Sequence, residues 1–303
     1  MSVPASRLAS PQPAALPSNT GSAGLLTRPL AASVPPATSP ASPLPKALER
    51  GRPLQANDTF SFGCHPGLSC FTHCCADVNI FLTPVDVLRL SRQTGLTTRE
   101  FLDRHTIMPI TKDLHLPVVL LKMDATAEKR CPFVGPQGCT VYDARPWACR
   151  MYPVATALPP ARAGVEVVPQ HVLFEDGFCL GHTEPQSWTV ADWQKDQHIP
   201  ETESLEAGFR ELVSHPWFIG GRQLDEKRIE LFFMAAYDLD TFREFVFQSS
   251  FLERFEVDEA TQASIRTDDE GLLRFGYQWL KYALFGEPTM TVRPRAVAQG
   301  RSR

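Results

Sequence analysis

The stretches that decide this fold read CHPGLSCFTHCC at residues 64–75 and CPFVGPQGCTVYDARPWAC at residues 131–149. They contain seven of the eight cysteines of the chain. The first follows the spacing Cys-x5-Cys-x3-Cys-Cys and the second Cys-x7-Cys-x9-Cys, while Cys179 stands apart. Isolated core thiols would not be bunched in this way, so the sequence predicts a site that is built from cysteines.

Disulfide bonds do not explain the clustering. The Cα atoms of Cys74 and Cys75 lie about 3.8 Å apart, below the roughly 4.4–6.8 Å that a disulfide spans. A chain of 303 residues with 43% hydrophobic residues also needs no disulfide framework to stabilise its core. We therefore predict a metal or cluster site, and its candidate ligands are Cys64, Cys70, Cys74, Cys75, Cys131, Cys139, Cys149 and Cys179.

The spacing alone leaves the metal open. Structural zinc favours paired cysteines two to four residues apart, and only Cys70-x3-Cys74 has that spacing. The ferredoxin run with two-residue gaps is also absent. An iron–sulfur cluster is wider than one ion and can take ligands from more distant loops. Both an iron–sulfur cluster and zinc remain candidate cofactors at this point.

The two stretches carry a family resemblance. FGCHPGLSCFTHCCADVNIFLTPVDVLRL, followed by CPFVGPQGCTVYDARPWACRMYP, resembles the YkgJ-type CxxCxxCC cysteine-cluster family of zinc- or iron-chelating proteins, over about residues 60–155. Gaps of five and three residues replace the family's first two-residue gaps. The resemblance implies a cluster-binding role and favours an iron–sulfur cluster with a redox or cluster-dependent function. The alternatives are a non-catalytic zinc module and an enzyme like the flagellin lysine N-methylases, which share the cysteine module.

Two arginines flank the last cysteine of the second stretch. Arg145 and Arg150 could offset the negative charge of a thiolate-bound cluster, so we predict that both contact the cofactor. We also predict that six sulfurs converge in one neighbourhood, those of Cys70, Cys74, Cys75, Cys131, Cys139 and Cys149. No nucleotide-binding, nucleophile-elbow or metalloprotease motif is present, so the sequence identifies no catalytic residue and leaves open whether the protein is an enzyme.

The rest of the chain predicts an α+β, mainly helical fold. We expect a disordered Pro/Ala/Ser-rich arm at residues 1–55, a cysteine module with short strands at 56–183, a helical region at 184–290 and a basic tail at 291–303. Helix starts are predicted at Thr83 and Thr97, each followed by an acidic residue in its first turn, and at Asp240. Strands are expected within 114–123, at a sheet edge because of Pro117, and within 165–174.

Charge and hydrophobicity limit the partners. A net charge of −4 and a pI near 6.1 argue against nucleic-acid binding, which needs a basic surface. No run approaches the roughly 18 apolar residues of a membrane span, and the N-terminus lacks the apolar segment of a secretory signal. We therefore expect a cytoplasmic protein that does not bind membranes, with a redox or protein partner that the sequence does not identify.

Overall fold

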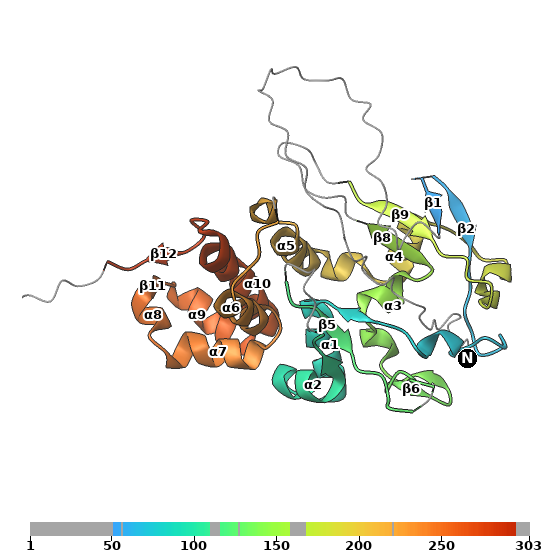
Figure 1. Ribbon diagram of the computed structural model, residues 1–303, viewed down its shortest axis with the longest axis horizontal. Helices are drawn as coiled ribbons and strands as arrows, with labels where there is room; N and C mark the ends of the chain where they lie inside the picture. Colours follow the sequence, from blue (N-terminus) through green and yellow to red (C-terminus); the bar gives the residue numbers. More distant parts are fainter. Residues whose placement is uncertain are drawn as a thin grey trace, which may run out of the picture.

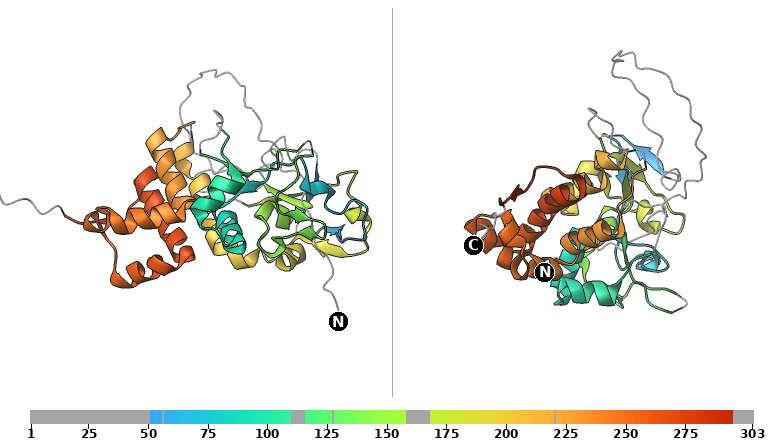
Figure 2. Two further views of the ribbon diagram at one scale, coloured as in Figure 1. Left: turned by 90° about the horizontal axis from the view of Figure 1, so that it is seen from below. Right: turned by 60° about the vertical axis from the view of Figure 1, so that its left-hand side comes forward.

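The structure is a computed structural model, and it describes residues 51–55, 57–109, 116–126, 128–157, 168–219 and 221–294. Helices α6 to α10 gather at one end of the molecule, and most of the short strands lie towards the other (Figure 1). The same division is visible from two further directions in Figure 2. This confirms the predicted α+β, mainly helical fold.

The α-helices occur along the whole of the described chain and become more frequent towards its C-terminal end. They are α1 (Pro84–Thr94), α2 (Thr98–His105), α3 (Trp147–Met151), α4 (Val190–Asp196), α5 (Glu203–Val213), α6 (Glu226–Ala236), α7 (Leu239–Gln248), α8 (Phe251–Arg254), α9 (Glu259–Thr267) and α10 (Asp269–Leu280). A π-helical turn, η7 (Lys281–Phe285), extends α10. The 3-10 turns are η2 (His73–Cys75), η3 (Tyr142–Ala144), η4 (Leu180–Thr183), η5 (Pro200–Thr202) and η6 (Pro216–Phe218).

The strands are short and pair antiparallel in small sheets. The two three-stranded sheets are β1 (Arg52–Leu54), β9 (Gln170–Leu173), β8 (Val154–Ala157) and β3 (Phe81–Leu82), β5 (Val119–Leu121), β4 (Thr106–Ile107), each given in spatial order. The two-stranded sheets are β2 (Thr59–Ser61) with β10 (Ser187–Thr189), β6 (Val134–Gly135) with β7 (Gly138–Cys139), and β11 (Phe255–Glu256) with β12 (Thr291–Val292).

The first two helices begin where the sequence predicts. The Thr83 hydroxyl accepts from the backbone N–H of Asp86 at 3.1 Å, and the Asp86 carboxylate accepts from the N–H of Thr83 at 2.9 Å. Thr97 and Glu100 form the same reciprocal capping box. Gly95 ends α1 at a φ of 68°, a left-handed conformation that favours glycine. Both predicted helix starts are confirmed. The sequence could predict them because a helix cap depends only on neighbouring residues.

Two local predictions were wrong. β5 is the central strand of its sheet and not an edge strand, because Pro117 precedes the first paired residue and its missing N–H lies outside the ladder. The strand expected within 165–174 is present as β9, the central strand of its own sheet. Helix α7 is capped by Asp238, whose carboxylate accepts from the N–H of Thr241. Asp240 instead accepts a hydrogen bond from the Thr98 hydroxyl at 2.5 Å, which ties α7 to α2.

Two hydrophobic cores hold these elements together. The larger one packs α1, α2 and β5 against the C-terminal helices, so the N-terminal and C-terminal helices form one body. The smaller one lies at the strand end and contains Leu54, Phe60, Phe62, Cys64, Met151, Tyr152, Val154, Leu173, Val190, Trp193 and Ile199. β10 and α4 therefore pack with the cysteine-rich part, and the boundary predicted at residue 183 does not coincide with the division between the cores.

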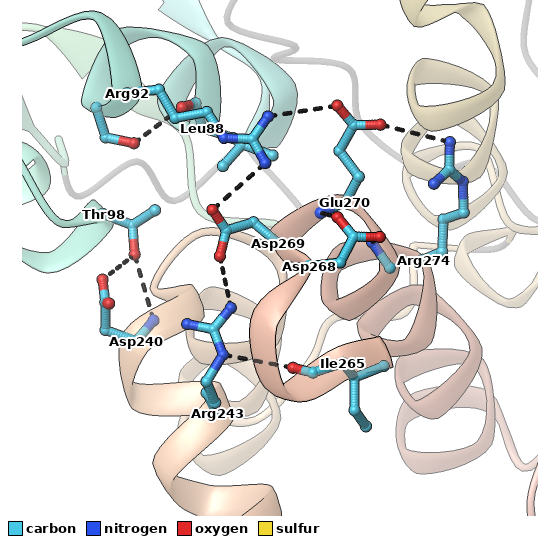
Figure 3. Close-up of polar contacts among 12 residues, drawn as sticks. Leu88, Arg92, Thr98, Asp240, Arg243, Ile265, Asp268, Asp269, Glu270 and Arg274 are labelled. Carbon is cyan, nitrogen blue, oxygen red and sulfur yellow. Dashed lines mark hydrogen bonds and ion pairs between the residues drawn. The ribbon is translucent and has the colours of Figure 1, made fainter. Parts of the chain in front are cut away.

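Ion pairs join α1 to the C-terminal helices on the surface. Arg92 pairs with Asp269 and Glu270, each at 3.4 Å, and Arg243 donates to Asp269 at 2.5 Å (Figure 3). Glu270 also pairs with Arg274 in the same close-up. Surface ion pairs contribute little individually, so the apolar contact beneath them is the main source of stability.

The structure moves both predicted ends of the ordered region. Residues 1–50 lie outside the described residues, but Arg52–Leu54, assigned to the predicted arm, form β1 and Leu54 is buried. At the other end, Thr291–Val292 of the predicted tail form β12. Backbone hydrogen bonding to distant strands, which the local composition does not reveal, includes these residues in the fold.

This difference predicts two outcomes for truncation. Deleting residues 1–55 removes β1, turns β9 into an edge strand and loses the buried Leu54 side chain, so the free energy of unfolding should fall by about 1–3 kcal/mol. Deleting only residues 1–50 should leave it unchanged. Urea denaturation of the two variants makes the comparison, and equal stabilities would show that β1 does not contribute.

Candidate metal centre

Backbone pairing joins the two cysteine-rich stretches. The N–H of Cys131 donates to the carbonyl of Cys75 at 2.7 Å, and the N–H of Asp77 donates to the carbonyl of Lys129 at 3.0 Å. This short antiparallel contact places Cys75 beside Cys131, although 55 positions separate them in the sequence.

A tight hairpin brings in the third cysteine. Strands β6 and β7 pair Val134 with Cys139, and the N–H of Val134 donates to the carbonyl of Cys131 at 3.1 Å. Cys131 and Cys139 therefore lie close together at the open end of this hairpin. Burial raises the pKa of Cys131 to about 12, and the nearby Cys139 contributes to this rise.

Helix α3 adds Cys149 to the same place. Four thiols, those of Cys75, Cys131, Cys139 and Cys149, line one small cavity of about 20 Å³, which we call the first thiol group. The other walls of this cavity are mostly apolar and include Ile80, Leu121, Phe133 and Val141. A mostly apolar wall limits water and so strengthens electrostatic interactions at the thiols.

Arg145 supplies a positive charge to this cavity. Its guanidinium lies 3.8 Å above the ring of Tyr142, and one Nη donates to the Tyr142 carbonyl at 2.7 Å. Burial lowers the pKa of Arg145, whereas the nearby Cys149 and Cys139 oppose this shift. The Nε of Arg145 is buried and has no hydrogen-bond partner within the described residues.

The remaining cysteines form a second thiol group, which consists of Cys64, Cys70, Cys74 and Cys179. Cys74 lies near both Cys64 and Cys179, and Cys179 lies near Cys70. The N–H of Leu180 donates to the Cys70 sulfur at 3.3 Å. This group borders the smaller core, to which Cys64 and Cys179 belong.

A close backbone approach brings Cys64 and Cys179 together. The N–H of Gly63 donates to the carbonyl of Gly181 at 3.0 Å. A Cβ at position 181 would lie 2.7 Å from the Gly63 carbonyl oxygen, so only glycine fits there without displacement of the backbone. The loop after Cys179 can therefore lie directly against the start of the first cysteine stretch.

Tyr152 stands beside the second thiol group as Arg145 stands beside the first. Its hydroxyl faces Cys179 but does not meet the geometry of an ordinary hydrogen bond, and it has no other partner in the described part of the chain. Burial raises the pKa of Cys179, and the nearby Tyr152 hydroxyl opposes that rise. Burial also raises the pKa of Tyr152 itself.

The six sulfurs predicted to converge are shared between these two adjoining groups, so their convergence on one centre stays a prediction. Cys75 joins the first thiol group, while Cys70 and Cys74 join the second, and the groups meet where Cys74 and Cys75 follow each other in η2. A hydrogen bond with Cys75, and then burial, raise the pKa of Cys74. All eight cysteines lie within the described residues and none forms a disulfide. No three of the Cys, His, Asp or Glu side chains in those residues form a ready-made metal site.

Arg150 has a different place from Arg145. Its guanidinium is buried and donates to three backbone carbonyls, those of Arg145 and Gln197, each at 3.0 Å, and that of Asp143. It therefore fixes the backbone of the loop that presents Cys149. Burial lowers the pKa of Arg150 to about 10, which leaves it charged at neutral pH.

The histidines near the cysteines have other partners. His65 accepts from the N–H of Gly67 and pairs with Glu184 at 3.3 Å. The ring of His73 packs against the edge of Phe178. Sequence reasoning gave neither Tyr152 nor Gln197 a role. Tyr152 could have been noticed because it stands three residues after Cys149, whereas Gln197 carries no local signal.

Comparison with known proteins supports the class of site. Residues 64–177 match the model of the CxxCxxCC family, described as "Putative zinc- or iron-chelating domain". This confirms the resemblance in the sequence and supports metal binding by this region. The match ends just before Cys179. No curated protein and no solved structure matches the chain significantly.

One finding bears on membranes. Among the helices of the described residues, none is long and apolar enough to cross a bilayer.

The contacts of Arg150 predict its contribution to stability. Arg150→Lys loses the planar fork that reaches three carbonyls and leaves buried acceptors unsatisfied, so the free energy of unfolding should fall by about 2 kcal/mol or more. Arg104→Lys, at an exposed ion pair on α2, should change it by less than about 0.5 kcal/mol. Guanidinium denaturation of both variants tests this, and equal effects would contradict the assigned role.

Proposed function

We propose that this protein holds two thiolate-bound metal centres, one in each thiol group, and that the first is an iron–sulfur cluster with a redox role. Each group contains four cysteines, the number that closes a thiolate site for an iron–sulfur cluster or for zinc. The observation that carries the proposal is the pair of buried donors beside them. The Nε of Arg145 and the hydroxyl of Tyr152 have no hydrogen-bond partner of ordinary geometry within the described residues. The Arg145 guanidinium lies near Cys149 and Cys139, and the Tyr152 hydroxyl lies near Cys179.

The residues fit a thiolate centre in their chemistry. A bound thiolate or cluster sulfur would accept the hydrogen bond that each donor lacks, and the positive charge of Arg145 would offset negative charge in the first group. The ligands of the first group come from three separate segments, as suits a wide cluster better than a zinc knuckle. When bound, an iron–sulfur cluster would supply one-electron redox chemistry.

One observation favours zinc as the second candidate. The cavity of the first thiol group measures about 20 Å³, which is close to the space of a single water molecule. A zinc ion would fit there with small side-chain movements, whereas a cluster would require the four thiols to turn outward. In that case the protein would be a non-catalytic module in which two ions join the loops to the helices.

Metal content and colour separate the two candidates. Full-length protein purified without oxygen should be brown, with visible absorption that bleaches on reduction, and should contain iron and acid-labile sulfide. Cys149→Ser should remove the metal of the first group and spare the second. Cys64→Ser should do the reverse, so each variant is the matched control for the other.

Two results would contradict the proposal. Colourless protein that carries stoichiometric zinc, even after anaerobic cluster reconstitution, would replace the iron–sulfur assignment with the zinc module. Complete loss of all metal in both cysteine variants, in protein that remains folded by circular dichroism, would show one shared centre instead of two.

A further inference from the structure

A second, larger cavity lies away from the thiols. It measures about 610 Å³, within the roughly 300–1,000 Å³ of typical small-molecule sites. Its walls come from α5, from the segment between α4 and α5, and from β8 and β9, which lie on one side of the molecule (Figure 1). Trp147, at the start of the helix that carries Cys149, forms part of the wall.

One buried carboxyl group stands out in this cavity. Glu206 lines it, yet only 4% of the residue is exposed. Within the described residues its only hydrogen bond comes from the Thr83 hydroxyl at 2.9 Å. Behind Thr83 lies Asp86, which is also buried and accepts from the N–H groups of Thr83 and Trp147, the latter at 2.7 Å. One buried carboxyl group, Glu206, therefore lines the cavity, and a second, Asp86, lies behind its wall at Thr83.

The pKa values of both carboxyl groups are raised, so each group keeps its proton to a higher pH than an exposed carboxyl group does. Burial, and then the charge of Asp86, raise the pKa of Glu206 to about 8. Burial raises the pKa of Asp86 to about 6. At neutral pH the Glu206 carboxyl group is therefore largely protonated. A cation bound beside it would favour the loss of that proton.

The other titratable side chains that line the cavity are either paired with each other or neutral. On its own helix, Arg210 pairs with Glu203, so neither is available to a ligand as a lone charge. Across the cavity, burial lowers the pKa of His171, which contacts the Thr156 hydroxyl at 3.0 Å and is neutral at pH 7.

Two tyrosines lie behind Glu206. The Tyr237 hydroxyl donates to the carbonyl of Leu82 at 3.2 Å. Tyr277, also buried, has an Oη without a partner in the described part of the chain. Both are neutral, because burial raises the pKa of Tyr237 and of Tyr277 above the ordinary value of a tyrosine.

The remaining walls are largely apolar. Trp147, Ile199, Phe209 and Val213 surround the space next to Glu206. An anion would find the charge of Asp86 behind Thr83 and no unpaired cation, and a purely apolar ligand would offer Glu206 no polar partner. We propose that this cavity binds a small organic cation, an ammonium or guanidinium group on a short apolar chain, with the Glu206 carboxylate as its counter-ion.

Binding then exchanges one cation for one proton. The ligand enters with its positive charge, Glu206 loses its proton to solvent, and the charge-assisted hydrogen bond replaces the O–H. The site does not depend on the metal centres, because no thiol lines the cavity.

The experiment uses n-butylammonium as the probe and the full chain as isolated, in titration calorimetry at pH 7. We expect saturable binding that neutral 1-butanol and anionic butyrate do not show. Glu206→Gln should weaken it by at least about tenfold, because one partner of a buried charge pair is lost. Glu211→Gln, at an exposed site on the same helix, should bind as the unmodified protein does.

A second measurement does not depend on any variant. Titration in buffers of different ionisation enthalpy should reveal proton release on binding at pH 7, and affinity should fall between pH 8 and pH 6 as Glu206 takes up its proton. Absence of n-butylammonium binding, binding without proton release, or unchanged binding by folded Glu206→Gln protein would each overturn the proposal.

Discussion

Two consecutive cysteines impose the central constraint on this structure. Cys74 and Cys75 lie in the 3-10 turn η2, where successive side chains leave the backbone about 120° apart, and a hydrogen bond joins their side chains. Cys75 enters the cavity with the ligands from the second stretch, while Cys74 faces Cys64 and Cys179. The two thiol groups meet at this peptide bond. Any change of η2 would therefore disturb both groups together.

The accuracy of the sequence analysis follows the range of the interactions. Caps at Thr83 and Thr97 were predicted because a few neighbouring residues determine them. The edge position of β5 was predicted wrongly because strand order depends on distant partners. The division of the cysteines depends on the contact between Gly63 and Gly181, residues that are 118 positions apart. The motif could therefore identify a thiol site and its ligand candidates, but not how they are grouped.

The same limit applies to the two arginines that flank Cys149. From sequence they are equivalent, since both could offset the charge of a cluster. In the structure, Arg145 lines the cavity of the first thiol group with a buried Nε that has no partner in the described residues, whereas each guanidinium nitrogen of Arg150 donates to a backbone carbonyl. The side-chain oxygen of Gln197 accepts a hydrogen bond from Arg145, and its backbone carbonyl accepts one from Arg150. A residue outside the family match thus helps to position the loop that carries Cys149.

Helix α3 connects the thiols to the larger cavity. Its first residue, Trp147, gives its N–H to Asp86 and its ring to the cavity wall, and its third residue is Cys149. Buried carboxyl groups such as Asp86 and Glu206 reduce stability unless they are well compensated, and such groups are concentrated at functional sites. Here the compensation is incomplete, because Glu206 receives only one hydrogen bond within the described residues. A charge change at either end of α3 would therefore act on a short, rigid element that both sites share. Trp147 and Cys149 stand two residues apart on this helix, so the wall of the proposed cation site and the first thiol group are neighbours along the chain although no thiol lines the cavity.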